Sequence, residues 1–205
     1  DQNYRNSREI LRCAYNFIID HLNEEMFTRE MDIQDPKEAN FTGPSPLVLK
    51  ADSFKEELEF AISFLEEEIE EQKQNDQSER SYSGCIVLCG FSLLQISNFA
   101  QKYGYSVLDG KQSFNKSEII FSDIEQTKGY EFDTVVILNC AENVIPPQWM
   151  PELEQWRIAS QLYVAMTRAR NKLYFSFNDV LSDWIVSCEL ESVPWKDLIE
   201  STHTL

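Results

Sequence analysis

Short apolar runs that resemble buried strands alternate with helix-like runs along most of this sequence. The clearest apolar run is residues 84–90, GCIVLCG, and a helical pattern over residues 93–100 follows it. Further strand-like runs cover residues 105–108, 119–124 and 135–138. Strands that alternate with helices predict crossover connections and therefore a parallel sheet with helices on its faces. We predict an α/β fold.

The first third of the chain contributes two further helical patterns. Apolar residues recur at helical spacing from Ile10 to Leu22, and Asn6 with Glu9 resembles a capping box at the start of that helix. After a short strand over residues 46–51, an amphipathic helix is expected from Phe54 to Ile69. Its polar face is almost entirely Glu, which indicates a solvated acidic surface or, as an alternative, a docking face over residues 54–71 for a basic protein partner. Residues 72–83 are expected to be a polar connection.

Length and composition limit the functional classes that remain. A chain of 205 residues can bury one sizeable core, so we expect a single domain over residues 1–205. It has no apolar run long enough to span a membrane and no signal-peptide pattern, so we expect a soluble, cytoplasmic protein. Its five cysteines lack metal-ligand spacing, and no metal site is predicted. The net charge of −17 disfavours a self-sufficient nucleic-acid binder, although charge can be segregated on one face.

Two arginines mark the segment over residues 162–177, LYVAMTRARNKLYFSF. A helix-like run carries Arg168 and Arg170 towards an alternating, strand-like end, so both lie at a helix-to-strand junction. A guanidinium held there suits phosphate oxygens and could act as an arginine finger, a contact that accelerates phosphoryl transfer roughly 10³- to 10⁵-fold. The alternative is that both arginines interact only with the helix dipole and solvent.

Three segments together resemble the UvrD/Rep/PcrA-like superfamily 1 DNA helicases. Residues 162–173 resemble motif VI of that family, residues 127–139 (TKGYEFDTVVILN) resemble motif V, and residues 2–11 (QNYRNSREIL) resemble motif IV. They occur in the family's order. The resemblance implies a RecA-like α/β domain, the second of the two motor domains of such a helicase. The chain begins inside a motif, so we expect it to be a C-terminal fragment.

The resemblance also assigns roles to residues. It implies that Tyr4 stacks on adenine, that Arg5 and Arg168 reach the γ-phosphate as catalytic groups, and that Glu131 binds the nucleotide sugar. Gly129 would allow a close backbone approach at the same nucleotide site.

The DNA contacts implied by the resemblance fit less well. Lys128 would contact nucleic acid. The sequence departs from the family just before it, because Asp123 and Glu125 stand where the family commonly has a Thr-x-His pattern that contacts DNA. Acidic groups repel phosphates, so these two residues receive no DNA-contact role.

The sequence has no GxxxxGK[ST] phosphate loop of its own. We therefore expect ATP and Mg²⁺ to be held mainly by an N-terminal RecA-like domain of the same protein, with this chain inactive alone and single-stranded DNA as the substrate track. The family's accessory insertion is absent or reduced to a loop between Tyr105 and Ile119. Residues 180–205 carry Trp184 and Trp195 at loose helical spacing and are expected to form a packing tail.

Two other hypotheses remain. The chain could be a degenerate helicase-like module without catalytic activity that acts through protein–protein interaction, which its net charge and the acidic residues Asp123 and Glu125 favour. It could also be an unrelated nucleotide-binding domain, which would require the three ordered motifs to be a coincidence.

Overall fold

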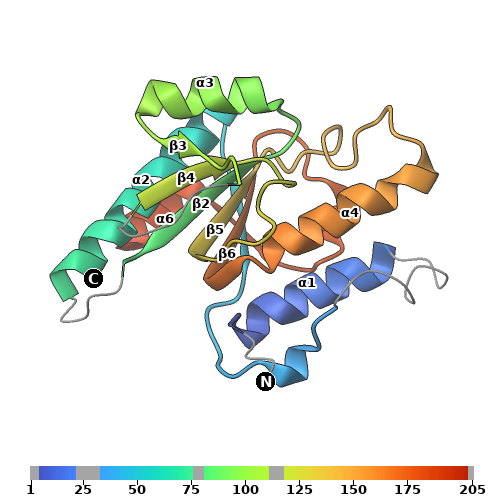
Figure 1. Ribbon diagram of the computed structural model, residues 1–205, viewed down its shortest axis with the longest axis horizontal. Helices are drawn as coiled ribbons and strands as arrows, with labels where there is room; N and C mark the ends of the chain where they lie inside the picture. Colours follow the sequence, from blue (N-terminus) through green and yellow to red (C-terminus); the bar gives the residue numbers. More distant parts are fainter. Residues whose placement is uncertain (1–4, 22–32, 76–80, 111–117, 203–205) are drawn as a thin grey trace.

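A seven-stranded parallel sheet with helices on both faces forms the centre of the molecule (Figure 1). The computed structural model describes residues 5–21, 33–75, 81–110 and 118–202. Within them every pair of neighbouring strands runs parallel. The α/β prediction is therefore confirmed.

The central strands are covered on both sides. All seven residues of the middle strand β5 are buried, as expected for a parallel strand between two helical layers. In spatial order the strands are β3 (Ser106–Val107), β4 (Glu118–Ser122), β2 (Ser83–Leu88), β5 (Phe132–Leu138), β6 (Ala169–Phe177), β1 (Leu47–Lys50) and β7 (Glu191–Pro194).

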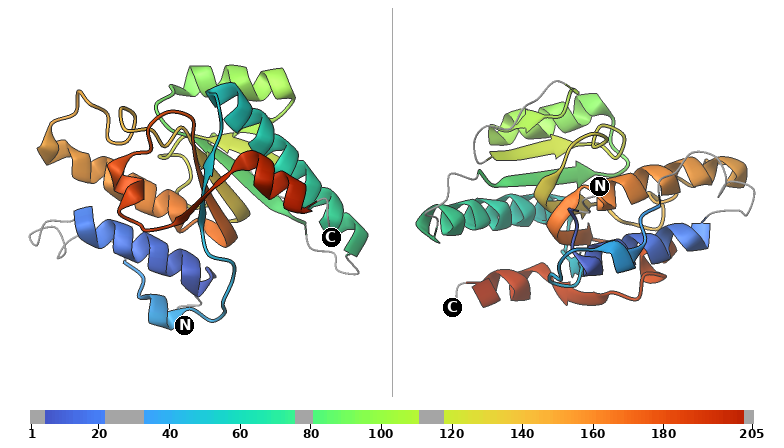
Figure 2. Two further views of the ribbon diagram at one scale, coloured as in Figure 1. Left: turned by 180° about the vertical axis from the view of Figure 1, so that it is seen from behind. Right: turned by 60° about the horizontal axis from the view of Figure 1, so that its bottom comes forward.

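The helices divide between the two faces of the sheet (Figure 2). Helices α1 and α4 pack on one face, and α2, α3 and α6 pack on the other. The bounds are α1 (Arg8–His21), η1 (Pro36–Glu38), α2 (Phe54–Asn75), α3 (Leu93–Tyr103), α4 (Glu152–Met166), α5 (Asp183–Val186) and α6 (Trp195–Thr202). No helix among these is both long and apolar enough to cross a membrane.

Alternation along β5 separates two hydrophobic cores. Val135 and Ile137 point into the core under α1 and α4, whereas Val136 and Leu138 point into the core under α2 and α3. Because both faces are apolar, the strand reads as a continuous hydrophobic run in the sequence, which is why it was recognisable there.

The connections after β2 and β5 leave the sheet in opposite directions. The chain after β2 crosses through α3 to β3 on one side, and the chain after β5 crosses through α4 to β6 on the other. The carboxyl ends of β2 and β5 therefore flank a topological switch point, the position where open α/β sheets commonly form a crevice. The amino ends of β5 and β6 lie at the opposite edge of the sheet.

Two local expectations were wrong. The predicted capping box does not form, because the Asn6 side chain donates instead to backbone carbonyls near the end of α4, and the Glu9 carboxylate accepts from the backbone of Gly43. Helix α2 continues through Asn75 into the stretch expected to be a connection. Residues 72–75 are polar but contain no Gly or Pro to end the helix.

The described part of the chain after β6 is not simply helical. It begins with α5 and then adds the edge strand β7, which pairs in parallel with β1. Trp195, the first residue of α6, is fully buried and its indole donates to the Ser176 hydroxyl at 2.8 Å. This bond lies on the α2 side of the sheet.

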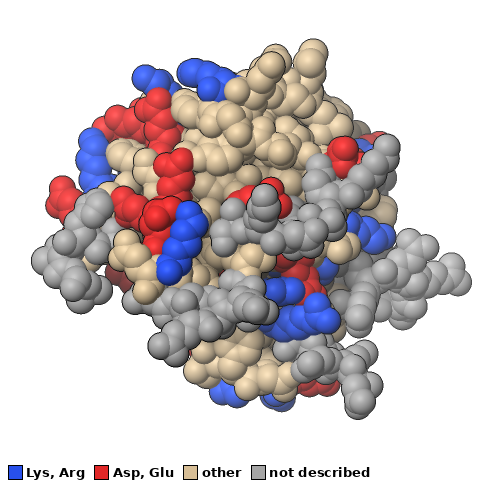
Figure 3. All heavy atoms as spheres, turned by 60° about the vertical axis from the view of Figure 1, so that its left-hand side comes forward, with Lys and Arg blue, Asp and Glu red and all other residues tan. Residues whose placement is uncertain are grey.

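Some glutamates of α2 are buried or paired, although the sequence predicts a solvated acidic face. Glu57 is fully buried and accepts a backbone hydrogen bond from Asn139 at 3.0 Å. Glu68 is only 10 % exposed and pairs with Lys172 on β6. Lysines are interspersed with the remaining acidic side chains on the side of the molecule shown in Figure 3. The proposed docking of a basic partner along α2 remains a prediction.

Candidate functional site

Residues from all three motif-like segments meet at the amino ends of β5 and β6. Arg5 lies just before α1, Glu131 just before β5, Arg168 just before β6, and Arg170 is the second residue of β6. The backbone ties these segments together, since the N–H of Phe132 donates to the carbonyl of Arg168 at 2.9 Å. The fold therefore brings three charged segments that are distant in sequence to one edge of the sheet.

Glu131 is the centre of this arginine cluster, which we define as Arg5, Glu131, Arg168 and Arg170. One carboxylate oxygen, Oε2, accepts from Arg5 at 2.8 Å and from Nε and Nη2 of Arg170 at 3.1 and 2.8 Å. Partial burial acts to raise the pKa of Glu131, but the hydrogen bonds and charges of Arg5 and Arg170 together outweigh it and lower that pKa below its usual value. The carboxylate stays ionised and holds two cations in place.

Arg168 is held separately, by the end of α4 and by the loop before β5. Its guanidinium donates to the Val164 carbonyl at 3.1 Å, to the Tyr130 carbonyl at 3.4 Å and to the Thr167 hydroxyl at 3.2 Å. Burial lowers the pKa of Arg168, while the charge of Glu131 acts in the opposite direction. These bonds use three of the five N–H donors of the guanidinium, so two remain without a partner in the described residues.

Asn6 positions this arrangement and was not recognised as a site residue from the sequence. Its buried Nδ2 donates to the carbonyl of Thr167 at 2.7 Å and to the carbonyl of Ala169 at 2.6 Å, the two residues on either side of Arg168. The next residue, Ser7, donates its backbone N–H to the Arg170 carbonyl at 3.0 Å. An Asn before a helix commonly caps that helix, so the sequence pattern predicted a local role for Asn6. It did not indicate hydrogen-bond partners more than 160 residues away.

The remaining predicted nucleotide-site residues are placed as follows. Gly129 adopts φ +90°, a left-handed conformation that favours glycine, and nothing described lies within 4 Å of the position of an added Cβ. Lys128 beside it is exposed and makes no hydrogen bond or ion pair with any described residue. Tyr4, predicted to stack on adenine, lies outside the described residues. The functional roles given to these residues stay predictions.

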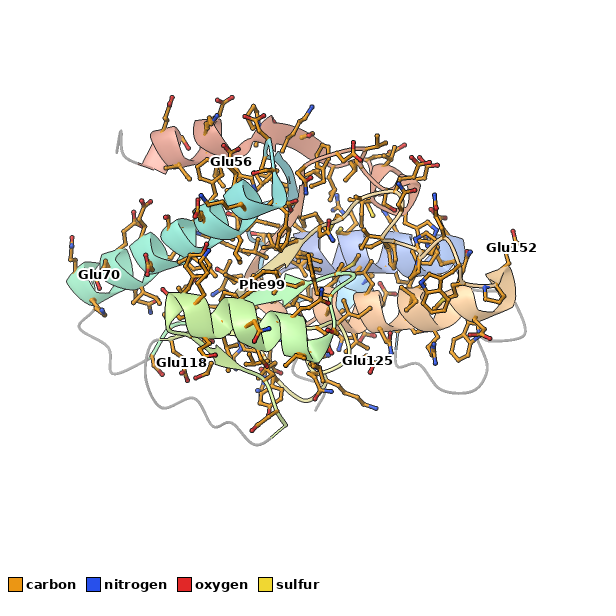
Figure 4. The ribbon with its side chains drawn as sticks, turned by 90° about the horizontal axis from the view of Figure 1, so that it is seen from above. Glu56, Glu70, Phe99, Glu118, Glu125 and Glu152 are labelled. Carbon is orange, nitrogen blue, oxygen red and sulfur yellow. The ribbon has the colours of Figure 1, made fainter. Side chains whose placement is uncertain are left out.

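Asp123 and Glu125 lie away from the arginine cluster, after the carboxyl end of β4. The Oδ1 of Asp123 accepts from the backbone N–H groups of Glu125 and Gln126 at 2.9 and 2.8 Å, which folds the chain into a turn. The Glu125 carboxylate accepts from the Gln161 amide of α4 at 2.7 Å. Figure 4 shows Glu125 at the surface between α3 and α4. The sheet thus has a basic amino edge and an acidic carboxyl edge at these positions.

The described part of the chain contains no candidate metal centre. There, no group of three or more His, Cys, Asp or Glu side chains is arranged to hold an ion. The positively charged donors of the arginine cluster suit phosphate oxygens, whereas the Glu131 carboxylate can accept from a hydroxyl group. The cluster therefore combines donors suited to phosphate oxygens with an acceptor suited to a hydroxyl group.

Comparisons with known proteins agree with this architecture. A family model, the UvrD-like helicase C-terminal domain, matches residues 66–180, more than half of the chain. Among solved structures, the C-terminal domain of a possible DNA helicase from Lactobacillus plantarum WCFS1 has a similar fold, with a TM-score of 0.55 and 18 % sequence identity over 90 % of this chain and 93 % of that one. No curated protein matches the sequence significantly. The matched range contains the motif V-like and motif VI-like segments and leaves out the motif IV-like one.

Proposed function

We propose, since the chain belongs to the family of UvrD-like helicase C-terminal domains, that it is the second motor domain of an ATP-dependent DNA helicase or translocase. The observation that carries this proposal is the arginine cluster. Residues from three motif-like segments converge at one edge of the sheet. Two cations there face a single acceptor, and the Arg5–Glu131 ion pair joins residues 126 apart in sequence.

Arg168 would act as the arginine finger of that motor. Its anchoring by Val164, Tyr130 and Thr167 fixes the plane of the guanidinium before any ligand arrives. The two remaining N–H donors can then meet oxygens of the γ-phosphate, and a preorganised cation stabilises the charge that develops during phosphoryl transfer. The proposed role of Arg168 is therefore catalytic, and that of Asn6 is to position it.

Arg5 and Glu131 would exchange partners when the nucleotide binds. Arg5 is 60 % exposed and is held only by Glu131 among the described residues, so a phosphate can compete for it. Glu131 keeps its two contacts from Arg170, which is less exposed, and its other lone pairs can accept from a sugar hydroxyl. Arg170 therefore keeps the carboxylate in place while Arg5 moves to the phosphates.

The rest of the ATP site would come from a first motor domain. ATP would bind there with Mg²⁺, and transfer of its γ-phosphoryl group to water would leave ADP and drive the motor. This chain lacks a phosphate loop, so it should be inactive alone and should complete the site by closing over the bound nucleotide. Repeated closing and opening would shift the two domains along single-stranded DNA, with Lys128 as a candidate DNA contact. A cytoplasmic location, expected from the sequence, remains part of this proposal.

The test is ATP hydrolysis by the protein that joins this chain to its first motor domain, with and without single-stranded DNA. We expect DNA-stimulated turnover in the parent and a fall of about two orders of magnitude or more in Arg168→Ala. Arg157→Ala is the matched control, because Arg157 is an exposed arginine on the same helix, α4, and lies outside the cluster. Equal turnover in the parent and in Arg168→Ala would remove the finger assignment.

A second candidate function is a partner-binding module without motor activity. The acidic pair Asp123 and Glu125, at the position where related helicases contact DNA, favours it because carboxylates repel the phosphate backbone. The same assay separates the two functions. A parent protein without ATP turnover, in which a phosphate loop is present on the first domain, would support the binding module.

A further inference from the structure

A hollow of about 210 Å³ opens at the carboxyl edge of the sheet, at the topological switch point. It lies between the segment that follows β2, the Asp123–Glu125 turn, the loop after β5 and helix α4. Strand β5 alone spans seven residues, so this hollow is roughly 20 Å from the arginine cluster at the other edge. It belongs to a different surface from the proposed nucleotide site.

The walls of the hollow are mainly apolar, and its charged side chains are both carboxylates. Phe91, Pro147 and Ile158 contribute apolar wall, while Asp123 and Glu125 contribute carboxylates. Neither carboxylate forms an ion pair within the described residues, and their recorded donors are neutral amides. Uncompensated carboxylates beside an apolar wall favour a ligand that combines positive charge with an apolar stem.

Gln161 also lines the hollow and carries an acceptor without a partner among the described residues. Its Nε2 donates to Glu125 at 2.7 Å, which turns the amide so that Oε1 is its free end. That oxygen is buried and has no hydrogen-bond partner among the described residues. A donor from a ligand that reached this oxygen would reduce the cost of leaving it unpaired.

We propose that this hollow receives an arginine side chain from a partner protein. Pockets that hold whole small molecules enclose about 300–1,000 Å³, so a volume near 210 Å³ fits one long side chain better than a nucleotide. The guanidinium is planar and presents several N–H donors at once, which suits two carboxylates that lie two residues apart. Its three-carbon stem packs on the apolar wall.

Exposed apolar side chains lie close in sequence to residues that line the hollow. Trp149, two residues after Pro147, is 76 % exposed, and Leu94, three residues after Phe91, is 72 % exposed. Large apolar groups at a protein surface commonly contact partners, and tryptophan is enriched among the residues that contribute most to binding. The net charge of −17 would also accelerate the approach of a basic partner. The partner is therefore a basic protein segment with an arginine between apolar residues.

The probe for this site is a capped peptide, acetyl-Gly-Leu-Arg-Leu-Gly-amide, titrated into the chain while amide chemical shifts are followed by NMR. The control peptide replaces arginine with citrulline, which has the same shape but no charge. We expect weak binding, with a Kd of about a millimolar, and shifts confined to the loops around Gly90, Glu125 and Pro147. The citrulline peptide should bind at least about fivefold more weakly, because a desolvated charge pair is lost.

Two variants test which charges matter. Glu125→Gln keeps an acceptor for Gln161, and Asp123→Asn keeps an oxygen for the turn, so both should fold while weakening the arginine peptide about fivefold. Glu70→Gln is the charge-matched control, since Glu70 is an exposed α2 residue paired with Lys73. It should leave binding unchanged.

Three results would overturn the assignment. Equal binding of the arginine and citrulline peptides would show that charge is not recognised. Equal losses in Glu125→Gln and Glu70→Gln would show only a general effect of net charge. Single-stranded oligothymidylate that shifts the same amides and displaces the peptide would make the hollow part of a DNA track. None of these outcomes depends on ATP hydrolysis, so the proposal stands or falls separately from the motor function.

Discussion

Glu131→Gln is the substitution that most clearly separates an organised arginine cluster from a chance arrangement of surface charges. Glutamine has the size of glutamate and keeps one oxygen, but it removes the charge that Arg5 and Arg170 share. Exposed ion pairs contribute about 0.2–1 kcal/mol to stability. The Glu131 and Arg170 side chains are only 29 % and 26 % exposed and form two hydrogen bonds, so their pair belongs at the upper end of that range. We expect a loss of about 1 kcal/mol.

The loss can be measured by urea unfolding near pH 7, and it corresponds to a fall in melting temperature of about 2–4 °C for a domain of this size. The pKa of Glu131 is lowered in the folded state, so its stabilising contribution is present above the ordinary glutamate pKa and is lost as pH falls through the folded pKa. The difference between parent and variant should therefore shrink in acid. High salt should reduce it as well, because the pair is partly exposed.

A double-mutant cycle assigns the effect to the pair. Glu131→Gln combined with Arg170→Met should cost less than the sum of the two single changes, by about 0.5–1 kcal/mol. Arg5→Met in place of Arg170→Met should show weaker coupling, because Arg5 is more exposed and donates one bond. A variant Glu131→Gln as stable as the parent near pH 7, or a difference that persists unchanged in acid, would refute the reasoning.

Three further substitutions test the supporting structure. Asn6→Ala should cost roughly 2–4 kcal/mol in urea unfolding, because two buried carbonyls lose their donor, and it should lower ATP turnover although every arginine remains. Burial raises the pKa of Glu57 in the folded state. As pH rises through that pKa, the parent should therefore lose stability relative to Glu57→Gln. Unfolding measured over a pH series tests this, and a constant difference between the two proteins would contradict the assignment. Trp195→Phe should cost about 2 kcal/mol in thermal unfolding, since it removes the indole donor from the buried Ser176 hydroxyl, and an unchanged melting temperature would argue against that bond.

The central strands and the motif residues were predictable because their signals are local. The run from Val135 to Leu138 is apolar on both faces, and Arg168 lies between a helical pattern and an alternating one, so both could be placed by spacing alone. The order of the three motif-like segments then indicated the family. Arg5 and Glu131 form an ion pair, and their shared role at a nucleotide site stays a prediction.

The features that were missed depend on partners distant in sequence. Strand β7 is short and contains Glu191, Ser192 and a proline, so it lacks the apolar alternation that marks a strand, and only the free edge of β1 makes it one. Glu57 looks like part of a solvated face, but its partners come from the loops after β5 and β6. Neither arrangement could be derived from helical or strand periodicity.

The most direct test of the motor proposal is the trapping of a transition-state mimic. The protein that joins this chain to its first motor domain would be incubated with ADP, Mg²⁺ and fluoroaluminate, and retained ADP would be measured for the parent, Arg168→Ala and the control Arg157→Ala. We expect the parent and Arg157→Ala to retain ADP, whereas Arg168→Ala should bind ATP normally yet fail to trap ADP, because the mimic carries the charge that Arg168 would stabilise. Equal trapping by all three proteins would contradict the role assigned to Arg168.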